Sequence, residues 1–205
     1  MEKDNITYNL ARENKELRQI YLDKIMQDCP NSVESLVYDS SWHNRDLYAD
    51  KLVYEGFLNA DEEKNGRYIL KKAYFIVMFS PKLVGVYRKH PIFISDKGFE
   101  INSEANFLSS VLDHESRHTN DLMHGMKLLD GFVINNENIG HLNPETIINL
   151  REARAYLNQL RNFKKRGVND SYFKEWVRWR LAECEKALYS ITPKTEAERH
   201  ALNCF

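Results

Sequence analysis

The strongest constraint on the fold is a long helix that the sequence marks at both ends. Asn143 is followed by Pro144, and this pair is typical of a helix start because asparagine caps the first turn and proline suits the first helical position. Gly167 can end the same helix, since glycine accepts the left-handed conformation that follows many helices. We therefore expect a helix from Pro144 to about Lys165.

Two more long helices are expected, one before it and one after it in the sequence. Asn102 or Ser103 can cap a helix that continues through regularly spaced apolar residues to Gly125. Apolar and aromatic residues with helical spacing also occupy Tyr172 to Tyr189, and Pro193 stops that pattern. Most of the second half of the chain is therefore predicted to be helical.

The N-terminal half combines helical and extended patterns. Helical spacing covers Asn5 to Gln27, and Pro30 closes it. The segments Arg67 to Phe79 and Leu83 to Ser95 are rich in β-branched and aromatic residues, which favours an antiparallel hairpin. Pro91 leaves open that the second segment forms two separate strands. The predicted fold class is α+β, with a small antiparallel sheet or hairpin among the helices.

The composition fits one globular domain. The chain has 205 residues, of which 42% are hydrophobic and 29% are charged. We expect a helical arm over 1–60, a core over 67–166, and a C-terminal helix and tail over 170–205. The formal net charge of -1 provides no basic field, so neither nucleic acid nor a membrane surface is an expected partner.

Cysteine use and the N-terminus bear on localisation. Three scattered cysteines without a CxxC pair argue against a disulfide scaffold and favour a reducing compartment. The polar N-terminus lacks the apolar core of a signal peptide, and the longest apolar run, Ala73 to Phe79, is too short to span a bilayer. We expect a soluble, cytoplasmic protein; export without a signal would leave the same pattern.

The helix that ends at Gly125 carries an H-E-x-x-H motif, formed by His114, Glu115 and His118. Residues four apart lie nearly above one another on a helix, so both histidines can bind one ion, and imidazole nitrogen suits Zn²⁺. Glu115 is turned by ~100° from His114 and so flanks the ion. There its carboxylate can take a proton from zinc-bound water, whose pKa the metal lowers to about 7. The motif predicts two zinc ligands and a general base; a histidine pair without metal is the alternative.

The motif and its surroundings resemble the zincin-like metallopeptidases, over about Tyr74 to Phe163. The resemblance implies a zincin-like fold, in which a small sheet packs on the motif helix. It also implies zinc-dependent hydrolysis of a peptide or protein substrate. The oligomeric state stays open.

A catalytic zinc needs a third protein ligand. Glu152 lies at the edge of the apolar face of the helix that starts at Pro144, and its neighbours Ala153 and Ala155 are small enough to let two helices approach closely. The sequence REARAY around it resembles the glutamate helix of gluzincins and minigluzincins, whose third ligand is a downstream glutamate. Glu152 is therefore the expected third ligand, with a solvated helix glutamate as the alternative.

Two other residues stay open as ligands. The sequence HESRHTNDLMH approaches the longer pattern of metzincins, which would make His124 the third ligand, but Asp121 stands where that pattern has glycine. On a continuing helix His124 points ~120° away from His118. Asp121 lies on the ligand face, where we expect it to accept an N–H from a ligand histidine or to hold Arg151 or Arg154. Two alternatives stay open for Asp121: it can bind the metal directly, or it can form a solvent-facing ion pair on its own helix.

Amide hydrolysis builds up an oxyanion, which needs a hydrogen-bond donor. Tyr156, one turn beyond the candidate glutamate ligand, is the expected donor, and His141 is the alternative. The predicted strand Leu83 to Arg88 can bind an extended peptide by strand addition. Trp176 and Trp179 are expected in the core, with a partner surface as the minority interpretation.

These patterns favour a zinc-dependent metallopeptidase with Glu115 as general base. The alternative from another class is a non-catalytic zincin-like protein with a binding or regulatory role, of an antitoxin, immunity or adaptor type. A helical adaptor without metal is the third hypothesis.

Overall fold

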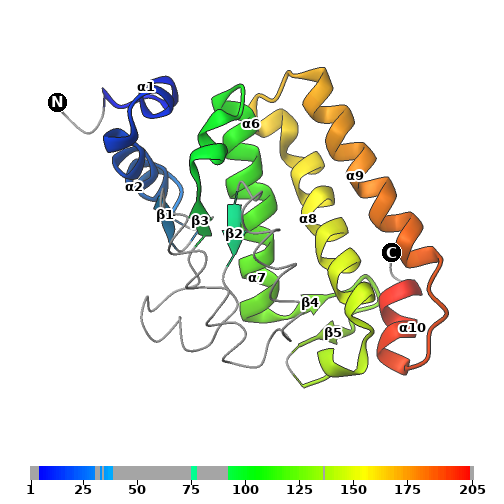
Figure 1. Cartoon of the computed structure of the whole chain (residues 1–205). Helices are drawn as coiled ribbons and strands as arrows, with labels where there is room; N and C mark the ends of the chain where they lie inside the picture. Colours follow the sequence, from blue (N-terminus) through cyan, green and yellow to red (C-terminus); the bar gives the residue numbers. More distant parts are fainter. Residues whose placement is uncertain are drawn as a thin grey trace, which may run out of the picture. The chain divides into compact units, whose positions relative to one another are not determined.

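The computed structural model describes residues 5–30, 33, 35–38, 75–77, 92–135 and 137–203, with residues 75–77 as backbone alone (Figure 1). These residues form an α+β protein that is mostly helical with a small sheet, as expected. The chain divides into two compact units, 1–107 and 108–205, and the expectation of a single domain stays a prediction. None of the helices in this described part is long and apolar enough to cross a membrane.

The first unit begins with short helices and contains a three-stranded sheet. Its elements are α1 (Tyr8–Glu13), η2 (Lys15–Leu17), α2 (Arg18–Asp28), β1 (Leu36–Tyr38), β2 (Phe75–Val77), β3 (Ile92–Ile94), η3 (Asp96–Glu100) and the start of α6 (Glu104–Ser109). The prediction of one continuous helix from Asn5 is wrong at Asn14. Asn14 is extended, with φ of -123° and ψ of 114°, and its side chain accepts a hydrogen bond from the Glu16 N–H at 2.9 Å. Asn14 therefore ends α1 and caps η2.

The sheet has the order β1-β3-β2. Strand β3 pairs antiparallel with β2, with Phe75 opposite Ile94 and Val77 opposite Ile92, which confirms the predicted antiparallel pairing of these segments. Strand β3 also pairs in parallel with β1, which the sequence patterns did not predict. The predicted strand from Leu83 to Arg88 lies outside the described residues.

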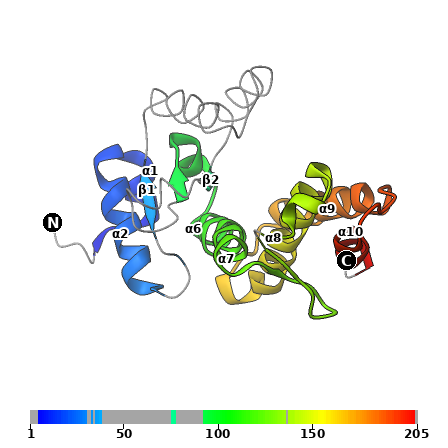
Figure 2. The same ribbon diagram turned by 90° about the horizontal axis from the view of Figure 1, so that it is seen from below.

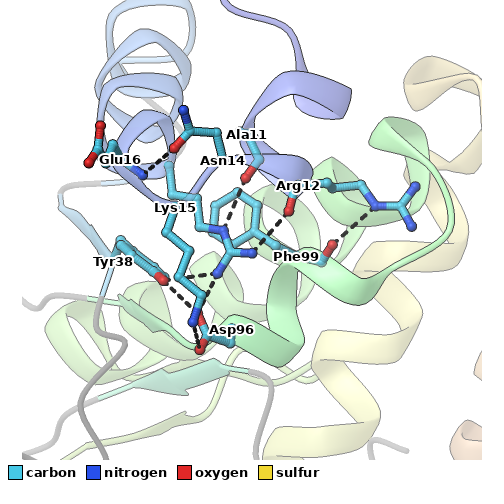
Figure 3. A network of polar contacts seen from close by, with 9 residues as sticks. Ala11, Arg12, Asn14, Lys15, Glu16, Tyr38, Asp96 and Phe99 are labelled. Atoms are coloured by element: carbon cyan, nitrogen blue, oxygen red, sulfur yellow. Dashed lines mark hydrogen bonds and ion pairs between the residues drawn. The ribbon is translucent and has the colours of Figure 1, made fainter.

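A buried arginine joins the helices of the first unit to η3. Figure 3 shows Lys15, Tyr38 and Asp96 of the same network. Arg18 donates hydrogen bonds to the Ala11 carbonyl at 3.0 Å and the Tyr38 hydroxyl at 2.9 Å, and it forms an ion pair with Asp96. Lys15 pairs with the same carboxylate at 2.8 Å. Burial alone would raise the pKa of Asp96, but hydrogen bonds from Lys15 and Tyr38 and the charge of Arg18 hold it below its ordinary value. The Arg18 guanidinium is thus balanced by the anionic carboxylate of Asp96.

The second unit is built around three long helical segments. Its elements are the end of α6, the π-helical segment η4 (Ser110–Glu115), α7 (Ser116–His124), β4 (Met126–Lys127), β5 (Val133–Ile134), η5 (Ile139–His141), α8 (Pro144–Arg166), α9 (Ser171–Tyr189) and α10 (Glu196–Asn203). Helix α8 contacts η4, α7 and α9, and it lies between α7 and α9 in both views (Figures 1 and 2). This arrangement brings the motif helix and the helix of the candidate glutamate side by side.

The predicted bounds of α8 and α9 are confirmed to within one residue. The Asn143 side chain accepts a hydrogen bond from the Glu145 N–H at 2.9 Å, and Gly167 adopts the left-handed conformation with φ of 69°. The Asp170 side chain caps α9 by accepting from the Phe173 N–H at 3.1 Å. Local capping therefore fixes both helices, as the sequence indicated.

The tryptophans of α9 lie outside its buried face, so the prediction that they are core residues is wrong. Trp176 is 41% exposed and Trp179 is 55% exposed. The buried residues of α9 are Val177, Leu181, Cys184 and Leu188, which repeat with helical spacing. This aliphatic stripe forms the buried side of α9, and the tryptophans fall beside it.

A close turn at Gly125 ends α7 and leads into the β4–β5 hairpin. Gly125 has φ of 77° and ψ of 164°, a region that only glycine adopts readily. A Cβ atom there would lie 2.8 Å from Val133 Cγ1 and 2.9 Å from the Ile134 carbonyl oxygen. Both the backbone conformation and the packing therefore require glycine at this position.

We expect Gly125→Ala to destabilise the protein more than Gly131→Ala. Gly131 also has a positive φ of 88°, but a Cβ there meets nothing within 4 Å. Gly131→Ala should cost about 1 kcal/mol from its backbone alone, whereas Gly125→Ala should add about 1–3 kcal/mol of overpacking. Denaturant unfolding of the two variants measures the difference, and equal losses would contradict the role of close packing.

Helix α10, where only a tail was expected, is tied to the start of α8. Thr195 and Glu198 form a capping box, in which the Glu198 N–H donates to Thr195 Oγ1 at 3.1 Å and the Thr195 N–H donates to Glu198 Oε2 at 3.3 Å. The other oxygen of Glu198 accepts from the Asn143 N–H at 2.8 Å. One buried carboxylate therefore holds the N-termini of both helices.

Candidate metal centre

The motif helix is one continuous helical run, but its middle is wound more loosely than an α-helix. The Asn106 N–H donates to Ser103 Oγ at 3.2 Å, so Ser103, one of the two predicted caps, starts the run, and Gly125 ends it. Residues Ser110–Glu115 form a π-helical segment, in which the Ser116 N–H bonds to the Val111 carbonyl. The first two motif residues thus lie in a π segment, a feature often found at functional sites. The expectation of a regular α-helix is wrong here.

Three side chains of the second unit meet at one point. His118 Nε2 lies 3.2 Å from Glu152 Oε1, and His114 Nε2 lies 3.6 Å from Glu152 Oε2. One donor atom from each of the three residues lies within 4.8 Å of the others. Both histidines are only 8% exposed. The arrangement therefore brings together the three residues that the sequence singled out as ligands.

The donor set and its spacing fit a tetrahedral zinc ion. Imidazole nitrogens and a carboxylate are ligands that zinc accepts, and ligands ~2.1 Å from a tetrahedral ion lie ~3.4 Å apart. The two distances from Glu152 to His114 and His118 fall on either side of that value. Three protein ligands would leave a fourth position for water or substrate. The two distances involve different oxygens of Glu152, and one donor atom from each residue lies within 4.8 Å of the others, so the cluster can hold a metal ion.

Each of the two histidines faces Glu152 with its Nε2 atom. The Nδ1 atoms of His114 and His118 are buried without a hydrogen-bond partner in the part of the chain that the structure describes. Metal-binding histidines usually donate this second N–H to a carboxylate or carbonyl. Among the described residues, Nε2 of each ring faces Glu152 and Nδ1 has no partner.

The charges of the cluster stabilise one another. Burial alone would raise the pKa of the Glu152 carboxyl, but hydrogen bonds with His114 and His118 outweigh it and hold this pKa well below its ordinary value. Burial would lower the pKa of His118, but its hydrogen bond with Glu152 and the charge of Glu115 raise it. Glu152 is therefore an anion at neutral pH, as a ligand carboxylate must be.

Glu115 lies beside the cluster and is half-buried. Burial raises the pKa of its carboxyl, the charges of His114 and His118 offset this only in part, and the charge of Glu152 adds to the rise. A carboxylate with a raised pKa accepts a proton more readily near neutral pH. Glu115 is thus close enough to His114, His118 and Glu152 for their charges to act on its carboxyl.

Tyr156 is buried against the cluster from α8. Its ring centroid lies 4.4 Å from that of His114, and burial raises the pKa of its phenol to about 12. The Arg180 Nε–H of α9 donates to the Tyr156 hydroxyl oxygen at 3.3 Å. Because that oxygen accepts from Arg180, the phenol keeps its own hydrogen for another acceptor.

Within the described part of the chain, Asp121 pairs with arginines and makes no hydrogen bond with His114 or His118. Arg154 donates to both oxygens of Asp121, at 2.8 and 3.0 Å, and Arg117 pairs with it at 2.9 Å. The sequence analysis considered that Asp121 holds Arg154, and this ion pair is present in the structure. The pair joins α7 to α8 one turn beyond His118.

A second buried ion pair on the other side of the motif was missed by the sequence analysis. Arg166 donates to both oxygens of Asp113, at 2.9 and 3.0 Å. The Asn158 side chain also donates to the Asp113 carbonyl at 2.7 Å. Asp113 directly precedes His114, and this position next to the motif could have pointed to it in the sequence. Together with Asp121, it fastens the motif segment to α8 at two points.

The remaining candidates lie elsewhere. His124 is exposed near the end of α7 and is not a member of the three-residue cluster. His141 is exposed in η5, where its carbonyl accepts from the Thr195 hydroxyl at 2.8 Å. Glu145 is exposed in the first turn of α8. The structure therefore brings Tyr156, and neither of these histidines, to the ligand cluster.

We expect Asp121→Asn to destabilise the protein by about 3 kcal/mol, because it leaves Arg154 without its buried anionic partner. The Asp121 side chain is 2% exposed. Asp130→Asn is the matched control, since Asp130 forms a more exposed pair with His200 and should cost less than about 1 kcal/mol. Urea unfolding compares the two variants. A loss at Asp121 no larger than at Asp130 would show that the buried pair contributes little.

Comparison with known proteins identifies no relative: no family model matches the sequence, and neither a curated protein nor a solved structure is significantly similar to it.

Proposed function

We propose that the protein is a zinc-dependent metallopeptidase with a zincin-like fold of gluzincin type. The observation that carries this proposal is the meeting of two imidazole nitrogens and the Glu152 carboxylate beside Glu115. His114, His118 and Glu152 would hold the zinc ion. When bound, the ion would lower the pKa of a water molecule to about 7 and polarise a substrate carbonyl.

The chain supplies the groups that move protons. Glu115 takes a proton from the attacking water and delivers it to the leaving nitrogen of the amide. Its raised pKa suits both steps, because the carboxyl is basic enough to accept the proton and acidic enough to release it.

Tyr156 stabilises the charge that develops on the carbonyl oxygen. Its hydroxyl oxygen accepts from Arg180, so its own hydrogen is available to the developing oxyanion. Packing of the phenol ring against His114 fixes the side chain, so little reorganisation is needed during the reaction. Its pKa of about 12 keeps the phenol protonated at neutral pH.

Metal analysis and a cleavage assay together test the proposal. The purified protein should contain close to one zinc ion per chain and should cleave an unfolded protein substrate. A chelator should abolish cleavage, and added zinc should restore it. Absence of zinc after mild purification would overturn the proposal. Stoichiometric zinc without cleavage of any peptide would instead indicate the non-catalytic binding or regulatory protein.

A further inference from the structure

Arg180 presents a positive charge at the candidate site, and this charge is not matched by an anion. Its Nε–H donates to the Tyr156 hydroxyl, and this is the hydrogen bond it makes with the described residues. No carboxylate within the described ranges lies at ion-pair distance from its guanidinium. The terminal N–H groups of Arg180 thus remain available on a half-buried side chain.

Two aromatic rings lie close to this guanidinium. Its Cζ lies 5.9 Å from the ring centroid of Tyr156 and 5.7 Å from that of Trp179. Trp176, one turn earlier on α9, contacts Tyr156 edge-on, with the ring centroids 6.1 Å apart. Arg180 is only half-buried, and an ion pair at a partly buried site is screened less by water than one on the open surface.

Zinc binding would reduce the negative charge that acts on the Arg180 guanidinium. The hydrogen bond to Tyr156 is the main cause of the raised pKa of Arg180, and the negative charge of Glu152 makes a smaller contribution. A divalent ion held by Glu152 would take up that charge, and the charge of Glu115 would balance the rest of the ion. The positive charge of Arg180 would then be unbalanced, and a substrate anion could neutralise it.

We propose that Arg180 recognises a carboxylate group of the substrate and that the protein therefore prefers peptides with a carboxylate close to the cleaved bond. The proposal rests on the proposed function of the zinc site. An arginine fork binds a carboxylate through two parallel hydrogen bonds, which suits the free terminal N–H groups of Arg180. The exposed faces of Trp176 and Trp179 would contact the apolar part of the same substrate residue.

The carboxylate can belong to an acidic side chain or to the C-terminus of the peptide. Binding of short peptides of random sequence to the zinc-loaded Glu115→Gln variant distinguishes these sources, because this variant should bind without cleaving. The peptides are offered in matched forms, with glutamate or glutamine at one position and with a free or amidated C-terminus. We expect one carboxylate form to bind about 10-fold more tightly than its neutral counterpart.

Substitutions on α9 assign this preference to Arg180. Arg180→Gln should remove the preference and leave the zinc content unchanged, whereas Arg180→Lys should keep part of it. Arg178→Gln is the matched control, since Arg178 is exposed on the same helix and its loss changes the net charge equally. No preference for a carboxylate, or a preference that survives Arg180→Gln, would overturn the proposal.

A second measurement keeps the two proposals separable. Wild-type protein should show the same preference as a ratio of kcat/KM between the matched peptides. Cleavage without a carboxylate preference would refute the role of Arg180 and leave the peptidase intact. Zinc-loaded protein that cleaves no peptide would refute the peptidase and, with it, the substrate preference.

Discussion

Replacing Glu152 with alanine should lower zinc affinity by about 100-fold or more, because loss even of a group that only supports a ligand typically costs about 10–100-fold. Glu152 contributes the one anionic donor among the three residues of the cluster, and both histidines face it. Competition with a zinc-binding dye measures the affinity. Dialysis followed by metal analysis gives the amount that remains bound.

His124→Ala and Glu145→Ala are the controls for this result. His124 was the other histidine considered as third ligand, and Glu145 is an exposed glutamate one heptad before Glu152 on the same helix. Both variants should bind zinc as the unchanged protein does. If His124→Ala lost more affinity than Glu152→Ala, the assignment of the third ligand would be wrong.

Replacing Glu115 with glutamine should keep zinc bound while reducing peptide cleavage by at least about 100-fold. Glutamine has nearly the shape of glutamate but cannot take a proton from water, so the change removes the base and preserves the packing. The zinc content and the cleavage rate of the same preparation are the two measurements. Persistent cleavage at a comparable rate would exclude Glu115 as the base.

Glu137→Gln provides a reference for the effect of removing one carboxylate. Glu137 is exposed in the loop before η5, and its loss changes the net charge by the same amount. It should affect neither zinc content nor cleavage. If both variants lost cleavage activity, the cause would be the changed charge of the protein rather than the loss of a proton acceptor.

The helices of the second unit could be predicted from the sequence because their ends are set locally. Asn143, Pro144 and Gly167 act on their own turns, and α8 begins and ends where they indicated. Helix α10 was missed because its capping box, Thr195 to Glu198, follows a proline that was interpreted only as a stop. Asn14 was missed for a similar reason, since apolar spacing continued across it.

The ligand cluster was predictable to the extent that it depends on helical spacing. His114 and His118 are four residues apart, and the alanines beside Glu152 are fully buried on a helix that contacts the motif helix. The π-helical winding of Ser110–Glu115 was not predicted from the sequence pattern. Arg166 and Arg180 come from distant turns of helix, so their approach to Asp113 and Tyr156 depends on how α8 and α9 pack.

The carboxylate of Glu198 also has a consequence for the order of assembly. It accepts the Asn143 N–H across 55 positions of the chain, next to the start of the helix that carries Glu152. During synthesis, the first turn of α8 is made before residues 195–198. At that stage the first turn can be capped by the Asn143 side chain but lacks the contact with Glu198. The mature N-terminal contact of α8 forms only after α10 has been made.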